Sequence, residues 1–273
     1  MSRLSLPSLA VVARAQKGGR GSSTRRRAAR SGFGGGTVVE RNAIFNQCRQ
    51  SGDHGPINSW DRQAFLTDVR YGPDRPSFSP APNVIRHNVI FANYGGSQGV
   101  DNDDGSAWFD IHANFMWGEG LKMDYGGHDS TYHGNVNVVH PYDGQQCVNV
   151  WEFARSGNAP CVGGEEDGAC SHAHMFYNNT CVVLEDYFYG TQQQEQCTAD
   201  DGTFNEDARA GMVRLHDNAY FSPNGTVLLK CPDKHDEVTL AFLQSGGVEN
   251  RSTAAPQPPD ETIVQWARDV VGF

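Results

Sequence analysis

A short pattern of apolar and polar positions recurs along the chain. It consists of an apolar residue, two variable residues, an asparagine and an apolar run that alternates with a period of two. The asparagines of the repeated segments are Asn42, Asn88, Asn114, Asn135, Asn179 and Asn218. Alternation with a period of two is typical of strands, and the i, i+3, i+4 spacing of an amphipathic helix is absent from these segments. The pattern therefore predicts short strands with a bend at each asparagine.

The spacing of the asparagines suggests how the strands are arranged. Successive asparagines are 46, 26, 21, 44 and 39 residues apart. Intervals of about 20–26 residues are typical of one coil of a solenoid, and we interpret the longer ones as two coils with a degenerate middle. Candidates for these middles are residues 64–66 and 148–150. A leucine-rich repeat would need a regular leucine skeleton, which is absent.

These features predict an all-β fold, a single-stranded right-handed parallel β-helix with a short C-terminal helix. Identical side chains one coil apart can form a hydrogen-bonded ladder. We therefore expect at least five coils, with Asn42, Asn88, Asn114 and Asn135 in one column. A mixed β-sandwich is the alternative fold.

Three regions differ in composition. Residues 1–36 hold eight Lys/Arg and no acidic residue. They are interpreted as a secretory signal, an organelle transit peptide or a start inside a longer protein, and are expected to lack stable structure. Residues 37–255 form the expected β-helix domain. Residues 256–273 combine a proline-rich linker with a short helix, capped by Asp260, that would cover the edge of the last coil.

Charge and cysteine content limit the function and the compartment. Removing the 8 basic residues of 1–36 from 22 leaves 14 against 32 acidic residues, or −18. This charge argues against a nucleic-acid partner, and no apolar run reaches the roughly 18 residues of a membrane span. Seven cysteines without a CxxC pair, and sequons at Asn178, Asn224 and Asn250, favour an oxidising compartment. We expect an extracellular, wall or matrix monomer, or alternatively an organelle protein, with a local disulfide between Cys161 and Cys170.

Three segments depart from the repeat: SGDHGPINSWDR at 51–62, GVDNDDGS at 99–106 and GLKMDYGGHD at 120–129. At these residues the chain resembles the pectin-lyase-like right-handed parallel β-helix proteins, over about residues 37–273. The resemblance implies the β-helix fold and action on acidic polysaccharides as a lyase, hydrolase or C5-epimerase. No catalytic signature of that superfamily can be carried over residue by residue.

The same segments supply the candidate catalytic residues. Counted from the asparagine of each coil, their carboxylates, imidazoles and cations fall at similar positions, so stacking would gather them on one face. The candidates are Asp53, His54, Arg62, Lys122, Asp124 and His128. Imidazoles beside carboxylates suit acid–base catalysis, and a lysine or arginine could bind a sugar carboxylate or serve as base. The structural alternatives are polar turns and salt bridges of Lys122 to Asp124 and of Arg62 to Asp61.

Binding residues are predicted on similar grounds. Flat aromatic faces for sugar rings are expected from Trp60, Trp108, Tyr125 and Trp151, whereas Trp117 is expected in the core. The alternating carboxylates Asp101, Asp103 and Asp104 resemble a hard-cation loop, which predicts Ca²⁺ as a cofactor. An ordinary solvated acidic turn is the alternative.

The function expected from the sequence is that of a secreted polysaccharide-active protein. It would be a lyase or C5-epimerase on uronate-containing glycans, with the three distinctive segments converging on one acidic groove. The alternatives are a non-catalytic glycan-binding or structural β-helix protein of a wall or matrix, and an inactive fragment of a larger protein.

Overall fold

The structure is a computed structural model. It describes residues 36–50, 54–59, 82–93, 97–103, 106, 108–118, 120–123, 129–139, 146–150, 174–184, 197–206, 213–230 and 237–272. The predictions for residues 1–35 and for Ala64, Phe65 and Leu66 lie outside these ranges.

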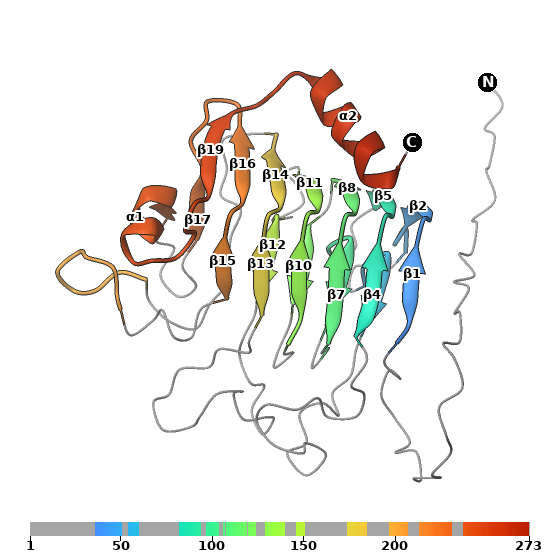
Figure 1. Ribbon diagram of the computed structural model, residues 1–273, viewed down its shortest axis with the longest axis horizontal. Coiled ribbons are helices and arrows are strands. Elements are labelled where there is room, and N and C mark those ends of the chain that lie inside the picture. The colour runs from blue at the N-terminus through green and yellow to red at the C-terminus, as the bar shows by residue number, and fades with distance from the viewer. Residues whose placement is uncertain are drawn as a thin grey trace, which may run out of the picture.

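Three parallel sheets dominate the described part of the chain (Figure 1). Sheet A consists of β1 (Val38–Glu40), β4 (Asn83–Arg86), β7 (Phe109–His112), β10 (Thr131–His133), β13 (Met175–Tyr177) and β15 (Arg214–His216). Sheet B consists of β2 (Ala43–Gln47), β5 (Val89–Asn93), β8 (Phe115–Trp117), β11 (Val136–Val139), β14 (Thr180–Val183), β16 (Ala219–Ser222) and β19 (Thr253–Pro256). Sheet C consists of β3 (Ile57–Ser59), β6 (Val100–Asn102), β9 (Leu121–Met123) and β12 (Val148–Val150).

The order of strands within each sheet follows the chain. The first strands of the chain fall in turn in sheets A, B and C, and each strand pairs in parallel with the next strand of its own sheet. Near the C-terminus, β17 (Leu228–Lys230) and β18 (Glu237–Thr239) pair antiparallel, and a short helix α1 (Leu240–Ser245) follows. The prediction of a β-rich chain with parallel sheets and a short C-terminal helix is confirmed.

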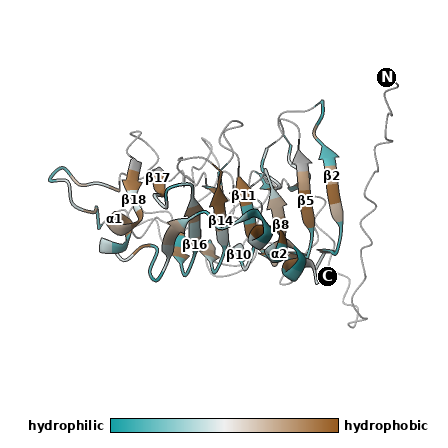
Figure 2. Cartoon of the chain, turned by 90° about the horizontal axis from the view of Figure 1, so that it is seen from above, coloured by the Kyte–Doolittle hydropathy of each residue, from teal (hydrophilic) through white to brown (hydrophobic). Residues whose placement is uncertain are grey.

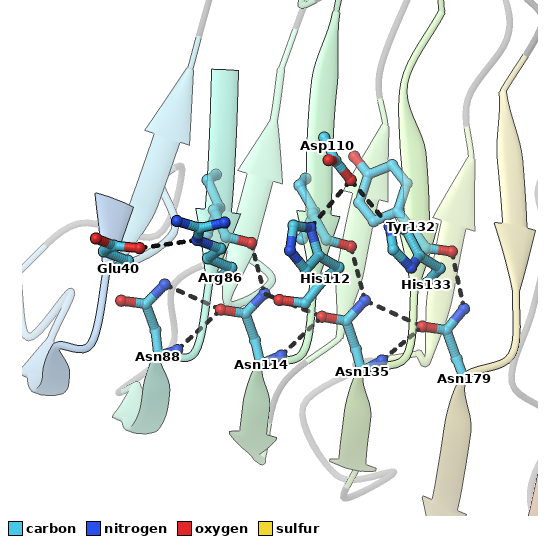
Figure 3. Close-up of polar contacts among 12 residues, drawn as sticks. Glu40, Arg86, Asn88, Asp110, His112, Asn114, Tyr132, His133, Asn135 and Asn179 are labelled. Carbon is cyan, nitrogen blue, oxygen red and sulfur yellow. Dashed lines mark hydrogen bonds and ion pairs between the residues drawn. The ribbon is translucent and has the colours of Figure 1, made fainter. Parts of the chain in front are cut away.

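The six repeated asparagines form one continuous column at the bend between sheets A and B (Figure 3). The amide of Asn88 donates to Asn114 Oδ1 at 2.9 Å, and the amide of Asn114 donates to Asn135 Oδ1 at 3.0 Å. The same amides also donate to a backbone carbonyl of the preceding coil, as Asn114 does to Ile85 at 2.8 Å. The predicted asparagine column is therefore confirmed.

The residue before each of these asparagines has a left-handed backbone. The φ angles are 58° at Arg41, 54° at His87, 51° at Ala113, 62° at Gly134, 53° at Asn178 and 56° at Asp217. This conformation costs free energy for residues other than glycine, and it persists only where the surrounding structure compensates for it. The hydrogen bonds of the following asparagine supply that compensation and turn the chain from sheet A into sheet B.

The interpretation of the long asparagine intervals is wrong. Asn42 and Asn88 bond directly although 46 residues separate them, and β2 pairs with β5. In the same way, Asn135 bonds directly to Asn179, and β11 pairs with β14. A long interval thus separates two strands that are direct neighbours in sheet B, and residues 148–150 form a strand of sheet C, paired with β9. Pairing tolerates such insertions because loop-closure entropy grows only slowly with length.

A continuous apolar core lies between the sheets. Its buried members include Ile85, Ile111, Tyr132 and Phe176 of sheet A, Ile90, Met116 and Tyr220 of sheet B, and Val100, Leu121 and Val148 of sheet C. Side chains one position along a strand point to the opposite face. The residues between these core positions therefore form columns on the outside of each sheet.

The C-terminal helix α2 (Asp260–Val271) covers the outer face of sheet B (Figures 1 and 2). Its Ile263 is buried with Phe115, Val138 and Val182, which face outward from the sheet. The expectation that it covers the edge of the last coil is wrong, since the apolar outer face of sheet B is what needs burial. Pro259, not Asp260, is the N-cap, and Asp260 begins the first turn.

One smaller prediction is corrected, and another stays a prediction. Trp117 is 41% exposed and not in the core, because Met116 takes the inward position of β8 and α2 does not bury Trp117. A disulfide joins Cys147 to Cys181, with Cα atoms 6.1 Å apart. Cys161 and Cys170, the pair expected from the sequence, lie outside the described residues.

Candidate functional site

A column of polar side chains runs along the outer face of sheet C. Asn58, Asp101, Lys122 and Asn149 are the central residues of β3, β6, β9 and β12, and they are neighbours in the strand register. The residues before them face the core: Val100, Leu121 and Val148 are fully buried. We call these four residues the sheet C column.

Asp101 is the most constrained member of the sheet C column. Its side chain is fully buried, although it points away from the apolar core. Asp101 Oδ2 accepts hydrogen bonds from the Gly55 backbone N–H and from the Asn58 amide, both at 3.1 Å. Burial raises the pKa of Asp101 above its usual value, while the neighbouring Lys122 charge opposes the rise.

Lys122 provides the positive charge of this site. Its Nζ lies 3.1 Å from Asp101 Oδ1 and 3.9 Å from Asp103 Oδ1, and its side chain is only 13% exposed. Asp101 and Asp103 are thus both partners of Lys122. Asp124, the partner considered in the sequence analysis, lies outside the described residues. A partly buried cation between two carboxylates is suited to exchanging one of them for an anionic group of a ligand.

The calcium interpretation stays a prediction, because Asp104 lies outside the described residues. Asp101 Oδ1 and Asp103 Oδ1 both face the Lys122 ammonium. The charge of Lys122 therefore offsets the negative charges of these two carboxylates, as a bound Ca²⁺ ion would. The backbone N–H of Asp103 donates to the Ser59 carbonyl, and the Ser106 N–H donates to the Asp103 carbonyl.

Asn149, at the other end of the sheet C column, has a side-chain oxygen, Oδ1, that is buried and has no hydrogen-bond partner in the structure. Buried polar atoms are nearly always hydrogen-bonded, and an exception calls for an explanation. Asn149 is the register partner of Lys122, so an unsatisfied hydrogen-bond acceptor stands next to the positive charge of the site.

Among the other predicted residues, His54 lies beside the sheet C column. Gly55, the next residue, donates its backbone N–H to Asp101, and His54 is exposed. Trp108 is half-buried directly before β7 of sheet A, so it lies on a strand connection and not in the sheet C column. The remaining candidates lie outside the described residues: Asp53, Trp60, Arg62, Asp124, Tyr125, His128 and Trp151.

Counting from the column asparagine proved an unreliable guide to register. Lys122 follows its asparagine by 8 residues and Asp101 follows its own by 13, yet the two are direct neighbours. The connection between sheets B and C varies in length from one coil to the next. Register is consequently decided by strand pairing and not by distance along the chain.

A second outer column, on sheet A, was missed by the sequence analysis. The rings of His112, His133, Tyr177 and His216 stack on one another across four strands, with centroids 4.8, 5.1 and 5.0 Å apart. Asp110 lies beside the first two, and its Oδ1 is 3.1 Å from His112 Nδ1 and 3.0 Å from His133 Nε2 (Figure 3). Because the rings cover one another's faces, they present polar edges to the solvent.

The sequence did contain a signal for this sheet A column. Histidine stands two residues before the column asparagine at positions 112, 133 and 216, and tyrosine stands there at position 177. These positions were treated as variable. The period of two places them directly after an inward apolar residue and hence on the outer face.

Comparisons with known proteins add nothing to this picture: no protein-family model, curated protein or solved structure matches the chain. Neither helix of the described ranges has the length and apolarity that crossing a bilayer requires.

Proposed function

We propose that this chain is a right-handed parallel β-helix protein that acts outside the cell on a uronate-containing polysaccharide. The proposal depends on one observation, the Lys122 ammonium held between the Asp101 and Asp103 carboxylates on the outer face of sheet C. A polymer lying along the column would meet a new strand about every 4.8 Å, which is close to the length of one sugar unit.

The strand pairing supports the β-helix part of the proposal. Within each of the three sheets, successive strands pair in parallel in chain order. Connections between parallel strands of one sheet are right-handed in about 98% of proteins. That preference is the basis for the proposed hand.

The proposed role of Lys122 is to bind the uronate carboxylate. The two neighbouring carboxylates favour the charged form of the Lys122 amine. Lys122 is therefore suited to neutralising the charge of a uronate carboxylate and poorly suited to accepting a proton. When a substrate carboxylate displaces Asp101 or Asp103 from the Lys122 ammonium, the ammonium neutralises the charge of the substrate carboxylate. Neutralisation acidifies the adjacent C5–H bond, the first requirement of both elimination and epimerisation.

His54 is the proposed base in this reaction. It would take the C5 proton, since His54 is exposed and the next residue, Gly55, donates its backbone N–H to Asp101. In a lyase the electron pair of the C5–H bond forms the C4–C5 double bond, the C4–O bond breaks and the leaving oxygen takes a proton. In an epimerase the proton returns to the opposite face of C5. Asn58 and Asn149 would bind neighbouring hydroxyl groups.

The proposed compartment agrees with two features of the structure. A disulfide joins Cys147 and Cys181, and disulfides persist in oxidising compartments. The three sequon asparagines Asn178, Asn224 and Asn250 are all exposed, as glycosylation requires.

The test is to incubate the purified protein with pectate, alginate and glucuronan in deuterated water. A lyase gives the ultraviolet absorbance of unsaturated uronate ends, and an epimerase incorporates deuterium at C5 without new ends. Lys122→Met should reduce either signal at least 100-fold, equivalent to about 2.7 kcal/mol of transition-state stabilisation. Arg86→Met is the matched control, because it removes another ion-paired cation from an outer strand position, on sheet A.

Two outcomes would contradict the proposal. One is equal activity of the Lys122→Met and wild-type proteins. The other is the absence of both signals together with unretarded migration of the protein in gels cast with each polysaccharide. Retardation without turnover would instead establish the non-catalytic glycan-binding alternative for the same surface.

A further inference from the structure

We propose that Asp110, His112 and His133 form a binding site for a divalent transition-metal ion on the outer face of sheet A. One ligand atom from each residue can be chosen so that all three lie within 4.8 Å of one another. The site is separate from the sheet C column, and the inference does not depend on the proposed function.

Strand register brings the three ligands together. Asp110 and His112 are both on β7 and share its outer face, because two positions separate them along the strand. His133 on β10 is the register partner of His112. The three side chains therefore come from two paired strands and not from loops, so the backbone positions are fixed (Figure 3).

Ring stacking fixes the orientation of the imidazoles. The ring of His133 lies between His112, at 4.8 Å and 16°, and Tyr177, at 5.1 Å and 4°. Both imidazoles point one nitrogen at the same oxygen, Asp110 Oδ1, at 3.0 and 3.1 Å. In a zinc site with bonds of about 2.0–2.1 Å, tetrahedral ligand atoms are about 3.3 Å apart. Two of the three separations, 3.0 and 3.1 Å, are already close to this value.

Among the described residues, the two imidazoles do not share the Asp110 carboxylate with a lysine or arginine. In the part of the chain that the structure describes, Asp110 forms ion pairs with His112 and His133 and with no lysine or arginine. Its register neighbours are Val84 and Thr131, which carry no charge. Arg86 lies in the outer column next to that of Asp110, and its guanidinium forms an ion pair with Glu40 at 2.8 Å.

The chemistry of the ligands indicates the class of ion. Two imidazole nitrogens and one carboxylate oxygen suit Zn²⁺, Fe²⁺, Ni²⁺ or Cu²⁺, whereas Ca²⁺ and Mg²⁺ prefer oxygen ligands alone. Three protein ligands leave at least one position for water. The three side chains are 21–34% exposed, so this open position faces the solvent.

The test is titration of the full chain with Zn²⁺ by calorimetry, followed by Co²⁺ as a spectroscopic probe. His133→Phe and His112→Phe keep an aromatic ring in the stack but remove the ligand nitrogen, and Asp110→Asn keeps the size of the side chain. We expect each variant to bind one Zn²⁺ fewer than wild type, or to bind it at least tenfold more weakly. Each should also lose the visible absorption of a low-coordinate Co²⁺ complex.

His216→Phe is the matched control. It removes a histidine from the same stacked column, where the imidazole bonds to Asp217 and not to Asp110. It should bind Zn²⁺ and Co²⁺ as wild type does. The proposal is overturned if His133→Phe and Asp110→Asn keep the wild-type stoichiometry and affinity, or if His216→Phe lowers binding as much as they do. Far-UV circular dichroism of each variant verifies that it is folded before titration.

Discussion

Two of the polar columns of this protein, the asparagine column and the sheet C column, differ in how completely the hydrogen-bonding groups of their members are satisfied. The asparagine column between sheets A and B uses the same residue six times, and each amide bonds to the next asparagine or to a backbone carbonyl. The sheet C column uses three residue types in four positions: an amide, a carboxylate, an ammonium and a second amide. It includes a buried carboxylate with a raised pKa and a buried amide oxygen without a partner.

From this difference we infer that the asparagine column stabilises the fold and that the sheet C column serves the function. A column of identical side chains that serve as donor and acceptor closes its own hydrogen bonds and stabilises the stacking of coils. A mixed column with unsatisfied groups costs stability, and such local costs are typical of functional sites. Substitutions in the two columns should therefore differ in their effects on stability and on activity.

Breaking the ion pair of the sheet C column should have the largest effect on stability. Lys122→Met leaves the buried Asp101 carboxylate without its cation, and we expect a loss of about 3–5 kcal/mol. The double variant Asp101→Asn/Lys122→Met should recover most of this loss, since it removes both charges, but it should remain inactive. Urea denaturation measures both. A double variant as unstable as the single one would show that the column stabilises the fold in the way the asparagines do.

Interrupting the asparagine column should cost somewhat less. Asn114→Ala removes the donor to Ile85 and the acceptor for Asn88, both of which are buried. We expect a loss of about 2–3 kcal/mol in urea denaturation, because buried groups become unsatisfied. Asn42→Ala, at the end of the column and more exposed, should cost only about 1 kcal/mol. Equal losses at the two positions would contradict the account of a cooperative ladder.

The pH dependence of stability should have opposite signs at two aspartates. The pKa of Asp101 is raised from 3.8 by burial, so its contribution to stability is present below 3.8 and is lost as pH rises through the folded value. The pKa of Asp217 is lowered to about 2, chiefly by the Arg251 hydrogen bond, so its contribution is lost as pH falls from 3.8 through about 2.

Substitutions of these aspartates measure the two slopes. Relative to wild type, Asp101→Asn should gain stability as pH rises above 3.8, and Asp217→Asn should gain stability as pH falls below 3.8. Denaturation midpoints at a series of pH values give the comparison. Parallel slopes for the two variants would show that Asp101 is not desolvated in the folded protein.

The smallest effect is expected on the outer face of sheet A. Arg86 bonds to Glu40 at 2.8 Å, but both side chains are about 40% exposed, 42% and 38%. Arg86→Met should therefore change the free energy of unfolding by less than about 0.5 kcal/mol in urea denaturation. A loss of several kcal/mol would mean that outer charges stabilise the coils generally, and the contrast between the two columns would disappear.

Several predictions from the sequence failed because they used distance along the chain in place of strand pairing. The long intervals between Asn42 and Asn88 and between Asn135 and Asn179 were assigned two coils, but each spans one. The apolar residues of α2 were assigned to the edge of the last coil, but they pack on sheet B. Trp117 was assigned to the core because it follows a column asparagine closely, but it lies on the outer face of β8 and is 41% exposed.

The sequence by itself determined the features that repeat locally. The asparagine column, the strands on either side of it and the inward apolar positions follow from a period of two and a bend before each asparagine, which depend on neighbouring residues only. The juxtapositions that carry chemistry were decided by the tertiary structure. Asp101 meets Lys122, and Asp110 meets His133, through pairing between coils whose connections differ in length. No local pattern records that register, because only the stacking of complete coils sets which side chains become neighbours.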